Sequence, residues 1–191
     1  MNRTRKRYLF FLLALAAQRL WEVRKSQRHA ASLLAAGGLE VAPHQYRLMK
    51  LLHASWFVAM FGEVIGKRRP FRPALAWPAA LMFAAGQALR YASIVTLGPR
   101  WTARVVTQPG NPPVSHGIYR YLRHPNYLGV ALEIAAVPLL HTAWWTALVY
   151  SLANLLLLRA RIRVEEAALR AGAALSTGAK RSLDTTDGPD N

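Results

Sequence analysis

The sequence predicts an all-α protein, a polytopic membrane helical bundle of about five transmembrane segments with a C-terminal helical hairpin. Of its 191 residues, 53% are hydrophobic and only 18% are charged. Two long stretches, 73–98 and 127–158, each contain a single charged residue. A span through a bilayer core of roughly 30 Å takes about 20 apolar helical residues, so both stretches are long enough to cross a membrane.

The first two candidate spans are shorter than the later ones. Tyr8–Trp21 follows a basic N-terminus and includes Arg19, and Leu51–Gly66 includes Glu63. No small-x-small cleavage site follows the first apolar segment promptly, which argues against a cleaved signal peptide. We therefore expect these two segments to form the N-terminal part of the bundle, residues 1–72.

The later segments form one long span and a hairpin. Pro73–Gly98 carries only Arg90 and suits a single span. Residues 127–158 as one helix would reach about 48 Å, which is too long for one crossing. Pro138 interrupts the stretch, so we predict helices at about 127–140 and 142–158. The second of these has almost no polar face, unlike a core helix of a soluble bundle.

The charge distribution predicts the orientation. Lys and Arg number 25 against 9 Asp and Glu, a net charge of +16. With five spans, one side of the membrane collects 16 basic residues and the other 8. The richer side contains the loop 99–126 and the C-terminal stretch, so we expect both in the cytoplasm, at a bacterial inner membrane. Basic loops facing membrane lipids account for the charge without a nucleic-acid partner.

The cysteine content excludes two kinds of site, and the composition of the C-terminal residues predicts a disordered tail. The chain has no cysteine, so a disulfide scaffold and Cys-ligated metal sites are excluded, and we predict no metal site. Residues 172–191 are rich in Gly, Ser, Thr and Asp, a composition that predicts a disordered tail.

Two polar stretches flank the predicted hairpin, GIYRYLRHPNYLG at 117–129 and RARIRVEEAAL at 159–169. The hairpin brings them together on the cytoplasmic side. Arg161 and Glu165 lie four residues apart, on one helix face. The Arg fork suits an acidic acceptor and the carboxylate suits an ammonium or a ribose hydroxyl. An ordinary helix ion pair is the alternative for these two residues, and an interfacial position is the alternative for His124.

The motif RHPNYLG, followed by an apolar hairpin and RxxxEE, resembles the isoprenylcysteine carboxyl methyltransferase family of integral membrane enzymes. The resemblance covers about residues 75–170, and PVSHGIYRYLRHPNYLG is its most specific part. It implies S-adenosyl-L-methionine as the methyl donor, bound without a Rossmann domain by a methyltransferase core at 73–171. The stretch LGPRWTARVVTQPGNPPV is similar to a bacterial branch, which implies an acceptor such as a long-chain alkylpyrone in place of a prenylated protein.

The resemblance also implies roles for individual residues. It assigns Arg161 to the acceptor and Glu165 to the donor. Pro113 and Val114 match a short strand-like piece that precedes the donor-binding loop. The residues implied for that loop are Tyr119, His124, Pro125, Asn126 and Tyr127.

The leading hypothesis is O-methylation of a lipophilic acidic acceptor, either an isoprenylcysteine-like carboxylate or the enol or phenol hydroxyl of a polyketide. A phospholipid N-methyltransferase is one alternative, although an amine acceptor would make Arg161 unhelpful. A non-enzymatic transporter or scaffold subunit is another, with Glu63, Arg90 and Glu133 as the few charges that could line a path. Glu133 is alternatively a structural partner of Arg90.

Overall fold

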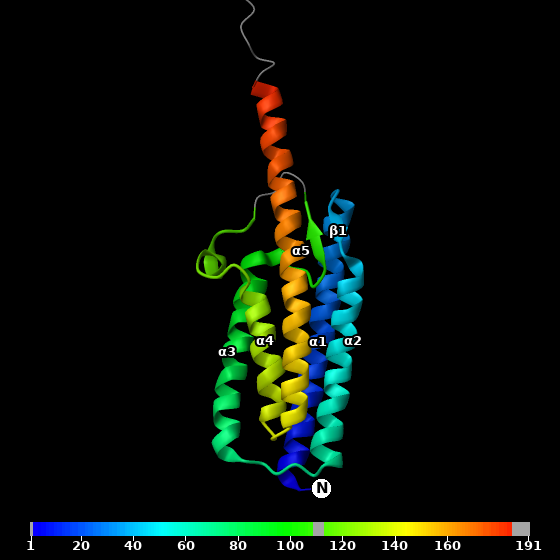
Figure 1. The fold of residues 1–191 in the computed structure, drawn as a ribbon, viewed down its shortest axis with the longest axis vertical. Helices are drawn as coiled ribbons and strands as arrows, with labels where there is room; N and C mark the ends of the chain where they lie inside the picture. The colour runs from blue at the N-terminus through cyan, green and yellow to red at the C-terminus, as the bar shows by residue number, and fades with distance from the viewer. Residues whose placement is uncertain (1, 109–112, 185–191) are drawn as a thin grey trace, which may run out of the picture.

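The protein is described here by a computed structural model that covers residues 2–108 and 113–184, with side chains as far as residue 171. Within these residues, five α-helices run along one long axis and lie side by side (Figure 1). The all-α prediction is therefore confirmed. The helices are α1 (Arg3–Ala35), α2 (Pro43–Phe61), α3 (Pro73–Leu97), α4 (Pro125–Leu139) and α5 (Trp144–Asp184).

Helix starts follow the positions of proline. Pro43, Pro73 and Pro125 stand in the first turns of α2, α3 and α4. Proline suits this position because its fixed φ is helical and its missing N–H would have no partner there. The C-terminal hairpin is confirmed, since α4 ends at Leu139 and α5 begins at Trp144. Thr142 makes the turn with a positive φ of 55°.

A small antiparallel sheet links the α1–α2 connection to the α3–α4 connection. The sequence patterns do not predict this sheet. Strand β1 (Leu39–Val41) follows α1, and β2 (Val105–Thr107) follows α3 and the short 3₁₀ helix η2 (Gly98–Arg100). The register pairs Leu39 with Thr107 and Val41 with Val105. The sheet therefore fixes the start of the loop that leads into the predicted site.

The π-helical segment η1 (Gly62–Gly66) extends α2 and directs Glu63 at the start of α5. One carboxylate oxygen of Glu63 accepts hydrogen bonds of 2.8 Å from both the backbone N–H and the hydroxyl of Thr146. The other accepts a 2.7 Å bond from Arg69. A carboxylate at a helix N-terminus is stabilised by the unpaired backbone N–H groups there. Glu63 is thus a helix cap and not part of a path through the bundle.

The connections gather at two opposite ends of the molecule. The start of α1, the α2–α3 connection and the α4–α5 turn lie at one end (Figure 1). The β-sheet, the connection from α3 to α4 and the far end of α5 lie toward the other. This is the grouping of loops that the charge count assumes for five spans.

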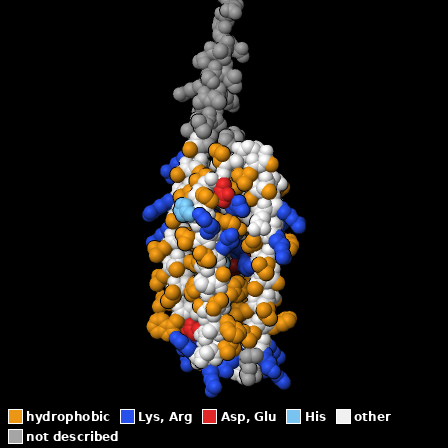
Figure 2. All heavy atoms as spheres, turned by 90° about the vertical axis from the view of Figure 1, so that its right-hand side faces the viewer, with side chains coloured by type: hydrophobic (Ala, Val, Ile, Leu, Met, Phe, Trp, Pro, Cys, Tyr) orange, Lys and Arg blue, Asp and Glu red, His pale blue; other side chains and the backbone are white. Residues whose placement is uncertain are grey.

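The outer surface of the bundle is apolar over its middle. Large apolar side chains stand exposed on the outside of several helices, among them Phe10 (75%), Val58 (72%), Trp77 (72%) and Leu156 (67%). Figure 2 shows hydrophobic side chains along the middle of one face, with Lys and Arg mainly toward the ends. Two helical stretches, Pro43–Gly66 and Pro73–Arg100, are long and apolar enough to cross a membrane.

Helix α5 extends further than the sequence predicts. It continues to Asp184, through most of the stretch whose composition predicts a disordered tail, while residues 185–191 lie outside the described part. Adding residues to an existing helix costs far less than nucleating a new one, so a long hairpin helix can continue into a weakly helical sequence.

Candidate active site

The first turn of α4 presents the RHPNY motif at the open end of the hairpin. His124 is the residue before the helix and has non-helical backbone angles of φ −131° and ψ 57°. Pro125 then starts the helix, because proline disfavours a helical conformation in the residue before it. Asn126 and Tyr127 therefore occupy the first turn, where α4 faces α3 and α5.

Tyr127 connects α4 to both polar residues predicted on α5. Its hydroxyl donates a 2.6 Å hydrogen bond to a carboxylate oxygen of Glu165. The guanidinium carbon of Arg161 lies 5.8 Å from the centre of its ring, within cation–π range. The structure thus brings together three residues that the sequence assigns to one site.

Arg161 is the most buried of these residues, with 2% of its surface exposed. Its Nη2 donates a 2.7 Å hydrogen bond to the backbone oxygen of Ala103, in the loop after α3. The N–H of Ala103 in turn donates 2.8 Å to the hydroxyl of Ser26 on α1. The Nε of Arg161 is buried and has no partner in the described part of the protein, so it is a donor available to a ligand.

The contacts of Arg161 and Glu165 do not match the alternative interpretation, an ordinary helix ion pair. Within the described residues, neither side chain forms a salt bridge with the other. Arg161 is held by a backbone carbonyl and Glu165 by a phenol. The two charges do not pair with each other, so each side chain can contact a different group of a ligand.

His124 forms the outer edge of the cluster. Its ring stacks on Tyr127 with a centroid distance of 5.6 Å and an interplanar angle of 20°. Its Nε2 lies 3.3 Å from a carboxylate oxygen of Glu166. This hydrogen bond is the main cause that lowers the pKa of Glu166 below its usual range.

Glu166 is a residue that sequence reasoning misses. Helical spacing predicts that it points away, because it is turned by about 100° from Glu165 on the helix. That prediction overlooks His124, which precedes α4 and lies to one side of Tyr127, where Glu166 can reach it. The sequence feature that could have identified Glu166 is the pair of adjacent glutamates. Neighbouring side chains on a helix point in different directions, so the two carboxylates can reach two different partners.

Tyr119 lies in the 3₁₀ helix η3 (Gly117–Arg120), packed against α3. Burial raises the pKa of Tyr119 to about 12, so its hydroxyl is protonated at neutral pH and can donate. Pro113 and Val114 are irregular here, and the strand-like piece expected at these two residues is wrong. Proline lacks the N–H that a ladder needs, and the strand forms earlier, at β2.

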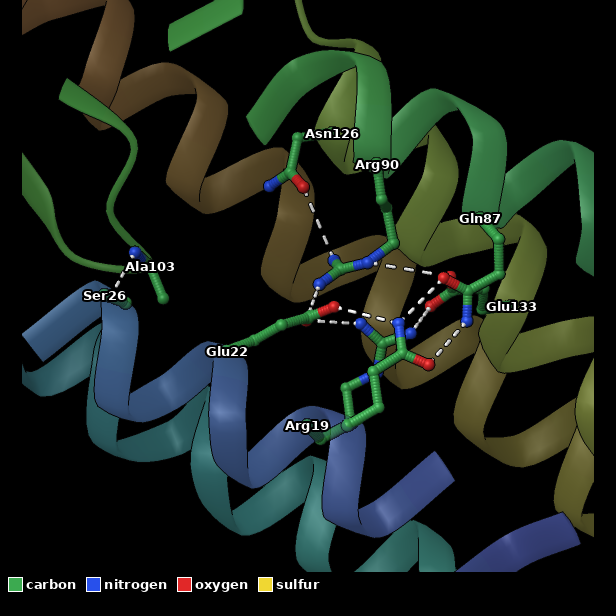
Figure 3. A network of polar contacts seen from close by, with 9 residues as sticks. Arg19, Glu22, Ser26, Gln87, Arg90, Ala103, Asn126 and Glu133 are labelled. Atoms are coloured by element: carbon green, nitrogen blue, oxygen red, sulfur yellow. Dashed lines mark hydrogen bonds and ion pairs between the residues drawn. The ribbon is translucent and has the colours of Figure 1, made fainter. Parts of the chain in front are cut away.

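A group of four charged residues, three of them buried and one partly exposed, lies behind the first turn of α4 (Figure 3). We refer to Arg19, Glu22, Arg90 and Glu133 as the charge cluster. Arg19 pairs with Glu22 at 2.5 Å and with Glu133 at 2.6 Å, and Arg90 pairs with both glutamates. Of the two alternatives for Glu133, the structural pairing with Arg90 is present. Helix α1 supplies two further members that the sequence does not connect with this pair.

Sequence comparisons with known proteins identify the family. The isoprenylcysteine carboxyl methyltransferase family matches residues 79–171. The uncharacterized protein YpbQ of Bacillus subtilis (strain 168) is 31% identical over 165 residues, which cover 85% of this chain and 97% of the relative. An uncharacterized protein of Haemophilus influenzae (strain ATCC 51907 / DSM 11121 / KW20 / Rd) is 28% identical over 156 residues, 81% of this chain and 90% of that protein.

The chain belongs to the isoprenylcysteine carboxyl methyltransferase family. The region that matches the family contains α4, most of α3 and the part of α5 that carries Arg161 and Glu165. The 165 residues shared with the Bacillus relative cannot all lie within 79–191, so similarity to that bacterial protein extends into the N-terminal helices. Membership implies a membrane-associated methyltransferase.

Proposed function

We propose that the protein is an S-adenosyl-L-methionine-dependent O-methyltransferase of the bacterial inner membrane, with its active site facing the cytoplasm. The observation that carries this proposal is the junction of Tyr127, Glu165 and the buried Arg161 at the open end of the hairpin. In this proposal all five helices cross the bilayer. The exposed apolar side chains around the bundle support that arrangement, because a soluble protein rarely leaves so many uncovered.

The residues at this junction fit the donor molecule. The aromatic face of Tyr127 tolerates a sulfonium cation, and the Glu165 carboxylate suits an ammonium or ribose hydroxyl. The side chains of Asn126 and Tyr119 add hydrogen-bonding groups next to them. When bound, S-adenosyl-L-methionine supplies an electrophilic methyl group. The stacked ring of His124 would exclude water from one side of that position.

Arg161 is proposed to hold the oxygen of the acceptor. A buried guanidinium whose Nε has no partner among the described residues favours an acceptor that is anionic, such as a carboxylate, an enolate or an acidic phenol. Such an oxygen is already nucleophilic near neutral pH, so the chain need not provide a strong base. Its contribution is orientation and exclusion of water. A neutral or cationic amine acceptor fits this pocket less well, which ranks phospholipid N-methylation lower.

The acceptor is proposed to be lipophilic and to enter laterally from the bilayer. It would be an isoprenylcysteine-like carboxylate or the hydroxyl of a long-chain polyketide such as an alkylpyrone. The alternative of a transporter loses its main support, because the three charges that could line a path through the bundle have structural partners. Glu63 caps α5, and Arg90 and Glu133 belong to the charge cluster.

Calorimetric titration of the detergent-purified protein with S-adenosylhomocysteine tests the donor site. Wild-type protein should bind, and Tyr127→Ala and His124→Ala should each bind at least about tenfold more weakly, since each removes one face of the site. Trp145→Ala, at the opposite end of α5 and 59% exposed, is the matched aromatic control and should bind normally. Absence of binding by wild-type protein would refute the proposal.

The acceptor class is tested separately, by methyl transfer from radiolabelled S-adenosylmethionine. Farnesylcysteine, a long-chain alkylpyrone and phosphatidylethanolamine serve as three candidate acceptors in one detergent. Transfer to either acidic compound supports O-methylation. Transfer to phosphatidylethanolamine alone would favour the N-methyltransferase.

A further inference from the structure

The charge cluster joins α1, α3 and α4 directly behind the first turn of α4. We propose that α1 positions the donor-binding loop through this cluster: Arg19 and Glu22 hold Arg90, and Arg90 holds the side-chain amide of Asn126. This inference rests on the proposed function. It assigns Glu22, Arg19 and Arg90 as positioning residues, and none of the three is among the site residues predicted from the sequence.

The first step is that Arg90 depends on its two carboxylates. Arg90 is 7% exposed, and its Nη2 donates to Glu22 while its Nε lies 3.6 Å from a carboxylate oxygen of Glu133. Removing one partner of a buried charge leaves the other uncompensated, which is strongly unfavourable. Arg90 is therefore fixed in place only while both glutamates are charged and correctly oriented.

The second step is that Arg19 orients both glutamates together. One end of its guanidinium lies 2.5 Å from Glu22 and the other 2.6 Å from Glu133. A planar guanidinium can bridge two carboxylates at once, whereas the compact ammonium of lysine cannot reproduce that fork. The four formal charges cancel, so the cluster can stay buried as a unit. An additional amide pair supports it, because Gln18 on α1 bonds to Gln87 on α3 at 3.0 Å.

The third step is the contact of Arg90 with the donor loop. Its Nη1 donates a 3.4 Å hydrogen bond to Oδ1 of Asn126. Guanidinium has no acceptor, so the oxygen of the amide and not its nitrogen must face Arg90. The amide nitrogen then points away from Arg90 (Figure 3). It can donate to an oxygen of the methyl donor, either a carboxylate or a ribose hydroxyl.

Arg90 also packs closely against the backbone of α4 at Gly129. A Cβ at Gly129 would lie only 2.7 Å from Cγ of Arg90 and 2.7 Å from the carbonyl oxygen of Gly86. Helices α3 and α4 therefore touch at backbone distance, less than one turn from Asn126. A displacement of Arg90 cannot be absorbed at such a contact without moving the first turn of α4.

Titration with S-adenosylhomocysteine of Glu22→Gln and Asn126→Ala, singly and combined, tests this inference. Glu22→Gln should weaken donor binding about tenfold, which corresponds to about 1.4 kcal/mol. The double variant should lose less binding free energy than the two single changes added together, because both changes weaken a shared support. Arg19→Lys keeps the positive charge and should disturb the fold less than Glu22→Gln. It therefore serves as the test variant if Glu22→Gln cannot be purified. It should weaken binding in the same direction.

The matched control is Glu63→Gln. Glu63 is also a buried glutamate paired with an arginine, but it caps α5 at the opposite end of the bundle. Its loss should lower thermal stability and leave the donor dissociation constant within about twofold. Equal weakening by Glu22→Gln and Glu63→Gln would overturn the inference, as would additive effects in the double variant or unchanged binding in Glu22→Gln. Failure of wild-type protein to bind would instead refute the proposed function.

Discussion

At the scale of single residues, the contacts of Arg161 and Glu165 separate two tasks. Arg161 is buried and turned toward Ala103 and the ring of Tyr127, while Glu165 receives the Tyr127 hydroxyl. Tyr127 thus contacts both charged side chains, which do not form an ion pair with each other. A pair intended only for helix stability would be exposed and in direct contact, and would contribute less than about 1 kcal/mol.

The first prediction follows from this division. Arg161→Lys should lower turnover by about 100-fold with little change in donor affinity, because lysine cannot replace the two-pronged contact with the acceptor. Glu165→Gln should weaken donor binding, since it removes the charge and keeps the shape. The donor dissociation constant and the turnover of both variants are the measurements. Small and equal effects on both quantities would mean that the two residues only stabilise α5.

At the scale of elements, the α3–α4 contact positions the site. Glycines at 86 and 129 allow the two helices to approach until a carbonyl of one would touch a Cβ on the other. Next to this contact, Arg90 on α3 reaches Glu22 on α1 and Asn126 on α4. The helical periodicity of the sequence predicts that both helices exist, but not which faces meet.

The second prediction concerns this crossing. Gly129→Ala should destabilise the protein by about 1–3 kcal/mol, since the added methyl group meets backbone that cannot move aside. It should also weaken donor binding, because Asn126 and Tyr127 lie in the adjoining turn. Thermal unfolding in detergent and the titration described above measure the two effects.

Gly62→Ala is the control for that experiment. In the part of the chain that the structure describes, a Cβ at Gly62 would meet no atom within 4 Å, and the backbone angles of Gly62 are helical. Alanine there should be neutral or slightly stabilising. A Gly129→Ala protein as stable as Gly62→Ala would show that the two helices can separate without cost.

At the scale of the whole molecule, the arrangement of the ends supports one orientation. The first turn of α4, the sheet and the far end of α5 lie toward one end of the bundle, and the hairpin turn lies at the other. Glu63 lies at the hairpin end, because it contacts Thr146 at the start of α5. Basic side chains occur at both ends, but the count favours the end with the site. Because positive loops are retained in the cytoplasm, that end is expected to face inward.

The third prediction tests this orientation with single cysteines, since the native chain has none. Ser115→Cys and Ala171→Cys lie at the end with the site, and Lys67→Cys lies at the opposite end; all three positions are exposed. In spheroplasts, an impermeant thiol reagent should label only Lys67→Cys, and lysis should expose the other two. External labelling of Ser115→Cys or Ala171→Cys would reverse the assignment.

Much of the architecture is predictable from the sequence because it depends on local patterns. Apolar runs predict that the helices exist, although α1 extends well beyond Tyr8–Trp21 and α2 begins at Pro43 instead of Leu51. Pro138 lies inside α4, and the turn of the predicted hairpin follows it. The hairpin alone brings RHPNY close to RxxxE, so sequence order and helix lengths are enough to locate the candidate site. The resemblance to the family then supplies roles for individual residues.

The partners of these residues are decided only by tertiary structure. Sequence spacing predicts that Arg161 and Glu165 share a face, but not that Tyr127 lies between them or that Glu166 reaches His124. Nor does it predict that α1 contributes Arg19 and Glu22 to a cluster with Glu133, more than a hundred positions away in the chain. A buried charge can be recognised from sequence by its apolar surroundings. Its counter-charge depends on how helices cross, which non-local packing determines.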